Sequence, residues 1–128
     1  MRTLRAALVG LMLLAALGAC RSKGSTLSAA PDPNTLVQVE VENHYMGDVV
    51  IYLVRGSDRQ RLGMVTALSS AEFSFPWRRL VASSSNRLLA YPIAGASAYA
   101  SDPLQVQPGQ WIKWTLESDL GRSSLAVY

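Results

Sequence analysis

Cysteine and histidine are almost absent from this 128-residue chain, which contains one of each. A single cysteine cannot close an intramolecular disulfide, so stability has to come from the hydrophobic core alone. No window of the sequence has the period of an amphipathic helix, and no internal repeat is strong enough to indicate a solenoid. The basic residues are scattered and have no interleaved aromatic platform, which argues against a nucleic-acid partner.

Signatures of catalysis are also missing. The one histidine, His44, would need an activated serine and a buried carboxylate to form a hydrolase triad, and no Gly-x-Ser-x-Gly elbow occurs in the chain. The carboxylates are scattered along the sequence, on outward faces or in turns. We therefore expect that the protein is not an enzyme and has no cofactor.

The N-terminus has three zones in the order of a secretory signal. Two arginines within the first five residues form a basic start, and Ala6–Leu17 is a run of twelve residues without a charge. As a helix this run spans about 18 Å, well short of the roughly 30 Å hydrocarbon core of a bilayer. The length favours a signal peptide over a transmembrane span. Two small residues then precede the single cysteine, Cys20.

The segment Leu17-Gly18-Ala19-Cys20 resembles the lipobox of bacterial lipoproteins. The resemblance implies that signal peptidase II recognises Leu17, Gly18 and Ala19 and removes residues 1–19. It also implies lipidation of the Cys20 thiol by a diacylglycerol, and two or three acyl chains hold a protein far more firmly than one. An ordinary secretory signal cut near Gly18 and an uncleaved N-terminal anchor are the alternatives.

Removal of the signal changes the charge and defines two further segments. Residues 20–128 hold ten Lys and Arg against nine Asp and Glu, a net charge of +1. Residues 20–34 comprise the lipidated cysteine and a flexible linker, because this stretch is rich in Ser, Ala, Pro and Gly. Residues 35–128 are enough for one small core and predict a single domain.

Alternating and apolar runs predict strands through most of this domain. Within 36–42, Val37, Val39 and Val41 alternate with polar residues, the pattern of a half-buried strand. The continuous apolar run 49–54 predicts a central strand covered on both faces. Further strands are expected at 59–66, 71–75, 87–93, 103–106, 111–117 and 123–127, with a polar loop at 76–86.

Seven or eight short strands separated by turns predict an all-β fold. The architecture we expect is a small antiparallel β-sandwich of the immunoglobulin-like or transthyretin-like kind. An up-and-down barrel would need longer and more uniform strands.

The motif His44-x-Met46 resembles the His-x-Met element of periplasmic copper chaperones, which are also small β-sandwiches. That resemblance implies imidazole and thioether ligands for Cu(I), with Met64 as a third candidate. The upstream His and Met of that family are missing here. A histidine in a solvent-exposed loop and methionines that fill a hairpin and the core are the simpler interpretation, so no metal site is predicted.

Two tryptophans, Trp77 and Trp111, are the candidates for ligand binding. Trp111 is expected on the strand face opposite Trp114, and Trp77 follows Pro76 in a loop. Exposed aromatic rings stack on sugars or anchor protein interfaces. The alternative is that both rings cap the open ends of the sandwich.

The sequence therefore favours a lipid-anchored envelope protein that displays a non-catalytic β-sandwich for binding or structural interaction. The expected partners are a membrane, through the N-terminal lipid, and an unidentified envelope protein. Arg21 follows the cysteine, and under the sorting rules of Gram-negative lipoproteins a residue other than Asp implies transport to the outer membrane. A copper-handling or a carbohydrate-binding lipoprotein is the alternative.

Overall fold

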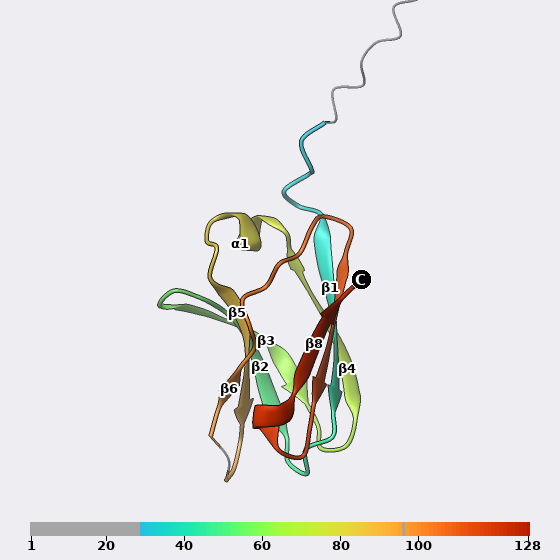
Figure 1. Ribbon diagram of the computed structural model, residues 1–128, viewed down its shortest axis with the longest axis vertical. Coiled ribbons are helices and arrows are strands. Elements are labelled where there is room, and N and C mark those ends of the chain that lie inside the picture. Colours follow the sequence, from blue (N-terminus) through green and yellow to red (C-terminus); the bar gives the residue numbers. More distant parts are fainter. Residues whose placement is uncertain (1–28, 96) are drawn as a thin grey trace, which may run out of the picture.

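The computed structural model describes residues 29–95 and 97–128, which fold into two stacked β-sheets (Figure 1). The expected signal 1–19, Cys20 and most of the linker 20–34 lie outside the described residues. The elements are β1 (Leu36–Asn43), β2 (Val49–Arg55), β3 (Asp58–Val65), β4 (Ser70–Pro76), α1 (Arg78–Val81), β5 (Asn86–Pro92), β6 (Tyr99–Ala100), β7 (Trp111–Leu116), the 3₁₀ helix η1 (Leu120–Arg122) and β8 (Ser124–Val127).

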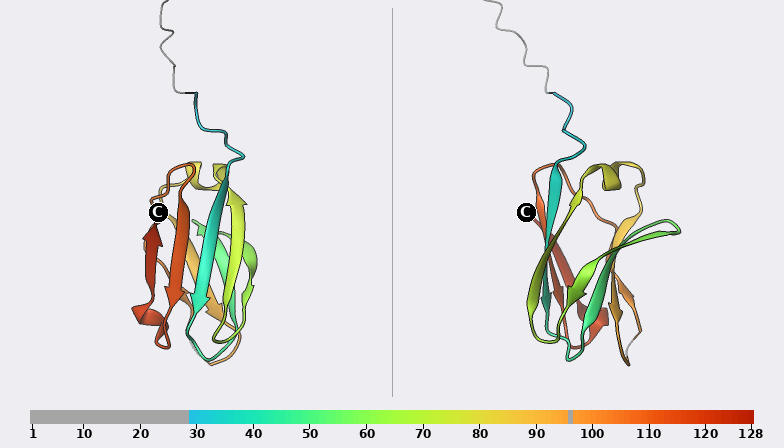
Figure 2. Two further views of the ribbon diagram at one scale, coloured as in Figure 1. Left: turned by 90° about the vertical axis from the view of Figure 1, so that its right-hand side faces the viewer. Right: turned by 180° about the vertical axis from the view of Figure 1, so that it is seen from behind.

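Each sheet has four strands. One has the order β4-β1-β7-β8, which faces the viewer on the left of Figure 2, and the other has the order β3-β2-β5-β6. The all-β sandwich predicted from seven or eight strands is confirmed. Two sheets of four agree with the transthyretin-like alternative and differ from the four-plus-three pairing of constant-type immunoglobulin domains.

The core fills the space between the sheets. Val37, Val39 and Val41 are fully buried, as their alternation predicted, and Trp114 on β7 and Phe75 on β4 are the largest buried side chains. Every residue of the buried apolar cluster lies between positions 37 and 120. The described part of the chain therefore contains a continuous buried core.

Strand direction differs from the expectation at one place. Five of the six strand pairings are antiparallel, but β1 and β7 pair in parallel, with Val39 beside Ile112 and Val41 beside Trp114. The sheet is therefore mixed. Period-two patterns in the two segments report burial and contain no information on direction.

The prediction of a strand at 103–106 is wrong. The sixth strand is β6, which pairs with β5 two residues before this segment begins. Pro103 has no backbone N–H to donate to a ladder. Leu104 and Val106 are nevertheless buried, so the apolar pattern reported burial correctly but not pairing.

Two smaller expectations are also corrected. The expected loop 76–86 contains the one-turn helix α1, and four residues are too few to show a helical period. Strand β2 is central in its sheet, but only its inner face is covered by the other sheet. On its outer face Tyr52 and Val54 stay partly exposed.

Asn43, at the end of β1, is a fully buried polar residue that shapes the loop behind it. Its Nδ2 donates to the carbonyl oxygens of Gly47 and Thr66, each at 3.0 Å, and its Oδ1 accepts from the backbone N–H of Tyr45 at 3.0 Å. These three bonds hold the segment 44–48, and with it His44, against the end of the sandwich.

Replacing Asn43 with Ala is expected to lower the free energy of unfolding by about 1–3 kcal/mol, because two part-buried carbonyl groups lose their donor. Urea denaturation of the domain measures the loss. Gln105→Ala, at an exposed position, is the control and is expected to stay within about 0.5 kcal/mol of the parent. Equal losses in the two variants contradict the role given to Asn43.

Candidate functional site

The outer face of the β4-β1-β7-β8 sheet brings together two of the side chains that the sequence singled out, His44 and Trp111, with several carboxylates. Because β1 and β7 lie side by side, the residues that alternate with their core positions form rows across the sheet. Gln38 lies beside Trp111, and Glu40 lies between Lys113 on β7 and Glu72 on β4. We call this surface the acidic face and define it by Glu40, Glu42, Glu72 and Glu117, with Lys113 and His44 among them.

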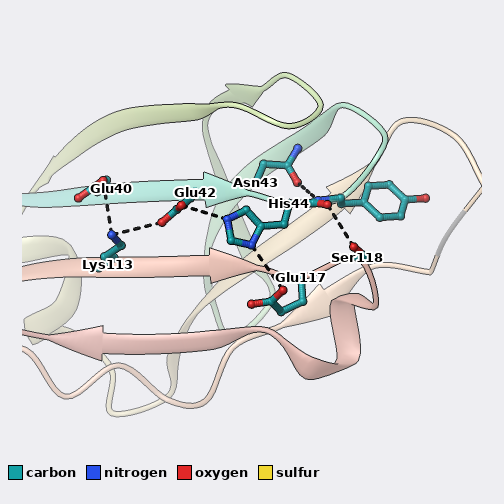
Figure 3. Close-up of polar contacts among 8 residues, drawn as sticks. Glu40, Glu42, Asn43, His44, Lys113, Glu117 and Ser118 are labelled. Atoms are coloured by element: carbon teal, nitrogen blue, oxygen red, sulfur yellow. Dashed lines mark hydrogen bonds and ion pairs between the residues drawn. The ribbon is translucent and has the colours of Figure 1, made fainter.

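A chain of ion pairs runs along the acidic face (Figure 3). Lys113 Nζ lies 3.2 Å from Glu42 Oε2 and 3.9 Å from Glu40 Oε1. The other oxygen of Glu42 lies 3.0 Å from His44 Nε2, and His44 Nδ1 lies 3.4 Å from Glu117 Oε2. Strand β1 contributes the two carboxylates at 40 and 42, and β7 with its following residue contributes Lys113 and Glu117.

These contacts shift the pKa values of three groups. The hydrogen bond with Glu42, followed by that with Glu117, raises the pKa of His44 above its usual 6.5. The hydrogen bond from His44, followed by that from Lys113, lowers the pKa of Glu42. The pKa of Lys113 is raised, first by its bond with Glu42. All three shifts favour the charged forms, so the chain is most complete when His44 is an imidazolium.

The geometry around His44 is not that of a hydrolase triad. Each ring nitrogen faces a carboxylate, whereas a catalytic histidine needs one nitrogen directed at a nucleophile. The hydroxyl of Ser118 donates to the backbone oxygen of His44 at 3.3 Å and not to its ring. The two carboxylates favour the imidazolium form of His44, and that form has no lone pair with which to accept a proton.

The three copper candidates are not brought together. Both nitrogens of His44 are engaged by carboxylates, and the Met46 side chain is 82% exposed in the loop after it. Met64 lies on β3 in the other sheet, paired with Val50. In residues 29–95 and 97–128 no group of three or more His, Cys, Asp or Glu side chains is placed to hold a metal ion.

Trp111 provides an aromatic border to the acidic face. Its ring stacks on that of Tyr128, with centroids 4.5 Å apart and planes 17° from parallel. An open hollow of about 440 Å³ lies beside it, lined by Leu36, Gln38, Glu40, Glu72, Gln110 and Trp111 among others. An aromatic ring next to amide and carboxylate groups is the combination that binds polar ligands with apolar faces, such as sugars.

The second candidate, Trp77, has a different position. It is the residue before α1 and packs, partly buried, against the hydrophobic core at one end of the sandwich. Its expected role as a cap of the open end therefore agrees with its packing. Trp77 and Trp111 belong to separate hollows.

Sequence reasoning singled out only His44 and Trp111 on this surface. Nothing local connects Lys113, Glu117 or Tyr128 with Glu42, His44 or Trp111. The outward positions of 36–42 and 111–117 are visible in the alternation. Only the parallel register of β1 and β7 brings these two sets of residues together.

Comparisons with known proteins identify no family. No protein-family model matches the chain, and no curated protein matches it. Among solved structures, the chain is similar to one described as the NMR structure of the protein from Eubacterium rectale, with 12% identity and a TM-score of 0.43 over 77% of this chain and 92% of that chain. A likeness at this level supports no statement about function.

Helices in the described part of the chain are short. None of them is both long and apolar enough to cross a membrane.

The His44 contacts predict a specific dependence of stability on pH. The pKa of His44 is higher in the folded state than its ordinary value of 6.5. The stabilisation that protonated His44 gives to the folded state is therefore complete below pH 6.5 and is lost as the pH rises through the folded-state pKa. Glu42, whose pKa is lowered, stays ionised throughout this window. We expect the difference in Tm between the parent and His44→Asn to be larger at pH 5.5 than at pH 9.

Proton NMR gives a direct check, because the chain has one histidine and hence one imidazole titration curve. The midpoint is expected above 6.5 in the parent and lower in Glu42→Gln. Glu72→Gln removes a carboxylate from the same face without a contact to His44, so it is the matched control. A parent midpoint at or below 6.5 would show that the two carboxylates do not stabilise the imidazolium.

Proposed function

We propose that this protein is a lipid-anchored bacterial envelope protein whose β-sandwich binds a partner on its acidic face and catalyses no reaction. The observation that carries the binding role is the hollow bordered by the Trp111–Tyr128 stack on an otherwise polar sheet face. A large aromatic side chain that stays 37% exposed beside a hollow is a common feature of interaction surfaces.

The anchoring half of the proposal is supported by the sequence. The segment Leu17-Gly18-Ala19-Cys20 follows a basic start and an apolar run of signal-peptide length. The linker after Cys20 separates the acyl chains from the folded domain, and Arg21 favours the outer membrane as the destination. An unidentified envelope protein is the partner class that this placement favours.

The non-catalytic half of the proposal is supported by the His44 geometry. The histidine that would have to act as a base is held between Glu42 and Glu117, with each ring nitrogen toward a carboxylate. These contacts stabilise the protonated ring, which is the form unable to accept a proton.

A carbohydrate is the second candidate partner, and the hollow beside Trp111 is the observation that favours it. Gln38 and Gln110 offer amide donors and acceptors, Glu40 and Glu72 offer acceptors, and Trp111 offers an apolar ring. Sugars present alternating hydroxyl groups and apolar C–H faces, which match this mixture. The ligand class would be the oligosaccharides of the bacterial envelope.

Replacing Cys20 with Ser is expected to abolish lipidation, since the hydroxyl cannot form the thioether. Labelled palmitate supplied to cells should be incorporated into the parent and into a Ser25→Ala control but not into Cys20→Ser. The Cys20→Ser protein should also leave the membrane fraction or accumulate with its signal uncleaved. Incorporation of palmitate into Cys20→Ser contradicts the anchor.

Replacing Trp111 with Ala is expected to weaken glycan binding on the order of tenfold, because the stacking surface is lost. Isothermal titration of the domain with soluble envelope glycan fragments measures the affinity, and Trp77→Phe is the control outside the hollow. If the parent binds no fragment, or Trp111→Ala binds as well as the parent, the carbohydrate candidate fails and a protein partner is favoured.

A further inference from the structure

Arginines without an acidic partner gather at the end of the sandwich where the linker enters. Residues 29–95 and 97–128 include seven arginines, and only Arg55 and Arg122 form ion pairs with carboxylates, namely Asp58 and Asp119. The other five, which lie on β3, α1 and β5, are Arg59, Arg61, Arg78, Arg79 and Arg87.

One of these arginines, Arg78, is joined directly to the linker. The backbone N–H of Trp77 donates to Thr35 O at 2.8 Å, and that of Arg78 donates to Pro33 O at 2.9 Å. The Arg78 guanidinium also donates to Asn34 Oδ1 at 2.9 Å. Helix α1 and the incoming chain therefore lie at the same end of the molecule, as Figure 1 shows.

Two more of these arginines, Arg59 and Arg87, lie on the outer face of the β3-β2-β5-β6 sheet. Arg59 on β3 and Arg87 on β5 both lie beside Val54 of β2, so the three residues form one row. The row lies close to α1, because the neighbouring Asn86 donates to Leu80 O at 2.8 Å. Arg59 also lies over the ring of Tyr52, 5.6 Å from its centroid.

Acidic groups are outnumbered in this region. Its carboxylates are Asp58, which is paired with Arg55, Asp32 in the linker and Asp102 after β6. Without Arg61, which lies farther along β3 beside Tyr52, five arginines against these three carboxylates leave an excess of two positive charges. The acidic face has the opposite balance even with His44 protonated, with four glutamates against Lys113 and His44, so the domain is electrostatically polarised.

Apolar groups are exposed among these arginines. Val81 at the end of α1 is 61% exposed. Trp77 lines a hollow of about 300 Å³ together with Val81 and Leu104. Arginine next to tryptophan and aliphatic side chains is the composition that favours the headgroup region of a bilayer.

We propose that this surface docks the domain on anionic phospholipid headgroups of the membrane that holds the lipid anchor. We call it the anchor-end surface and define it by Arg59, Arg78, Arg79 and Arg87 with Trp77 and Val81. The inference rests on the proposed function only in placing a membrane near this end. Docking would orient the sandwich with its arginines toward the lipid and leave the acidic face free for a partner.

Because the linker enters at the anchor-end surface, a membrane is favoured over an acidic protein as the binding partner of that surface. Fourteen residues separate Cys20 from Thr35. A flexible chain of fourteen residues spans about 20 Å, and a fully extended one about 46 Å. The anchor-end surface is thus held close to the headgroups, where each basic residue strengthens binding to an anionic surface about fivefold.

The test uses residues 29–128, which contain the whole described core, so that binding is independent of lipidation. In co-sedimentation, the parent is expected to bind vesicles containing 30% phosphatidylglycerol in phosphatidylcholine, and to bind pure phosphatidylcholine vesicles weakly. The double variant Arg59→Gln/Arg87→Gln should bind the anionic vesicles on the order of twentyfold less tightly. Arg122→Gln removes the same type of charge at η1, away from the surface, and should stay within about twofold of the parent.

Fluorescence provides a second measurement that does not depend on the charge variants. Brominated phospholipids in the vesicles should quench the parent, and Trp77→Phe should lose that quenching while Trp111→Phe keeps it. Equal binding to neutral and anionic vesicles overturns the proposal, as does undiminished binding by the double variant. Binding to polyglutamate without binding to vesicles also overturns it and favours an acidic protein. Palmitate labelling of the full chain judges the anchor separately.

Discussion

The parallel pairing of β1 with β7 is the contact on which the acidic face depends. On the inner side it places Val41 beside Trp114, within the core that joins the two sheets. On the outer side the same register places Glu40 beside Lys113. Because side chains alternate along a strand, a slip of one residue would turn Trp114 out of the core and break the ion-pair chain at once. Core packing therefore fixes the geometry of the surface.

Charge separation gives the domain two surfaces of opposite charge. The acidic face offers glutamates, His44 and the hollow beside Trp111, while the anchor-end surface offers arginines around α1 and the linker entry. If the protein is lipid-anchored as proposed, this arrangement would place one surface toward the membrane and leave the other open to a partner. Repulsion between glutamates and anionic headgroups would add to the orientation that the arginines favour.

Much of the fold could be predicted, because most of its strands are encoded by local alternation. Val37, Val39 and Val41 face the core as their spacing predicted, and Trp114 does the same on β7. The prediction of a strand was wrong where apolar residues are buried but do not pair with a neighbouring strand. The segment 103–106 places Leu104 and Val106 inside without forming a strand, since burial of a side chain does not require a hydrogen-bonded ladder.

The sequence by itself determined the strand-rich fold, the inward and outward faces of most strands, and a signal-like N-terminus ending in a lipobox-like motif at Cys20. These properties depend on residues close together along the chain. Only the tertiary structure decided that Trp111 meets Tyr128, that His44 meets Glu117, and that α1 lies against the linker at Pro33. Each of these contacts joins segments far apart in sequence, and the pairing of strands that creates them leaves no local pattern to read.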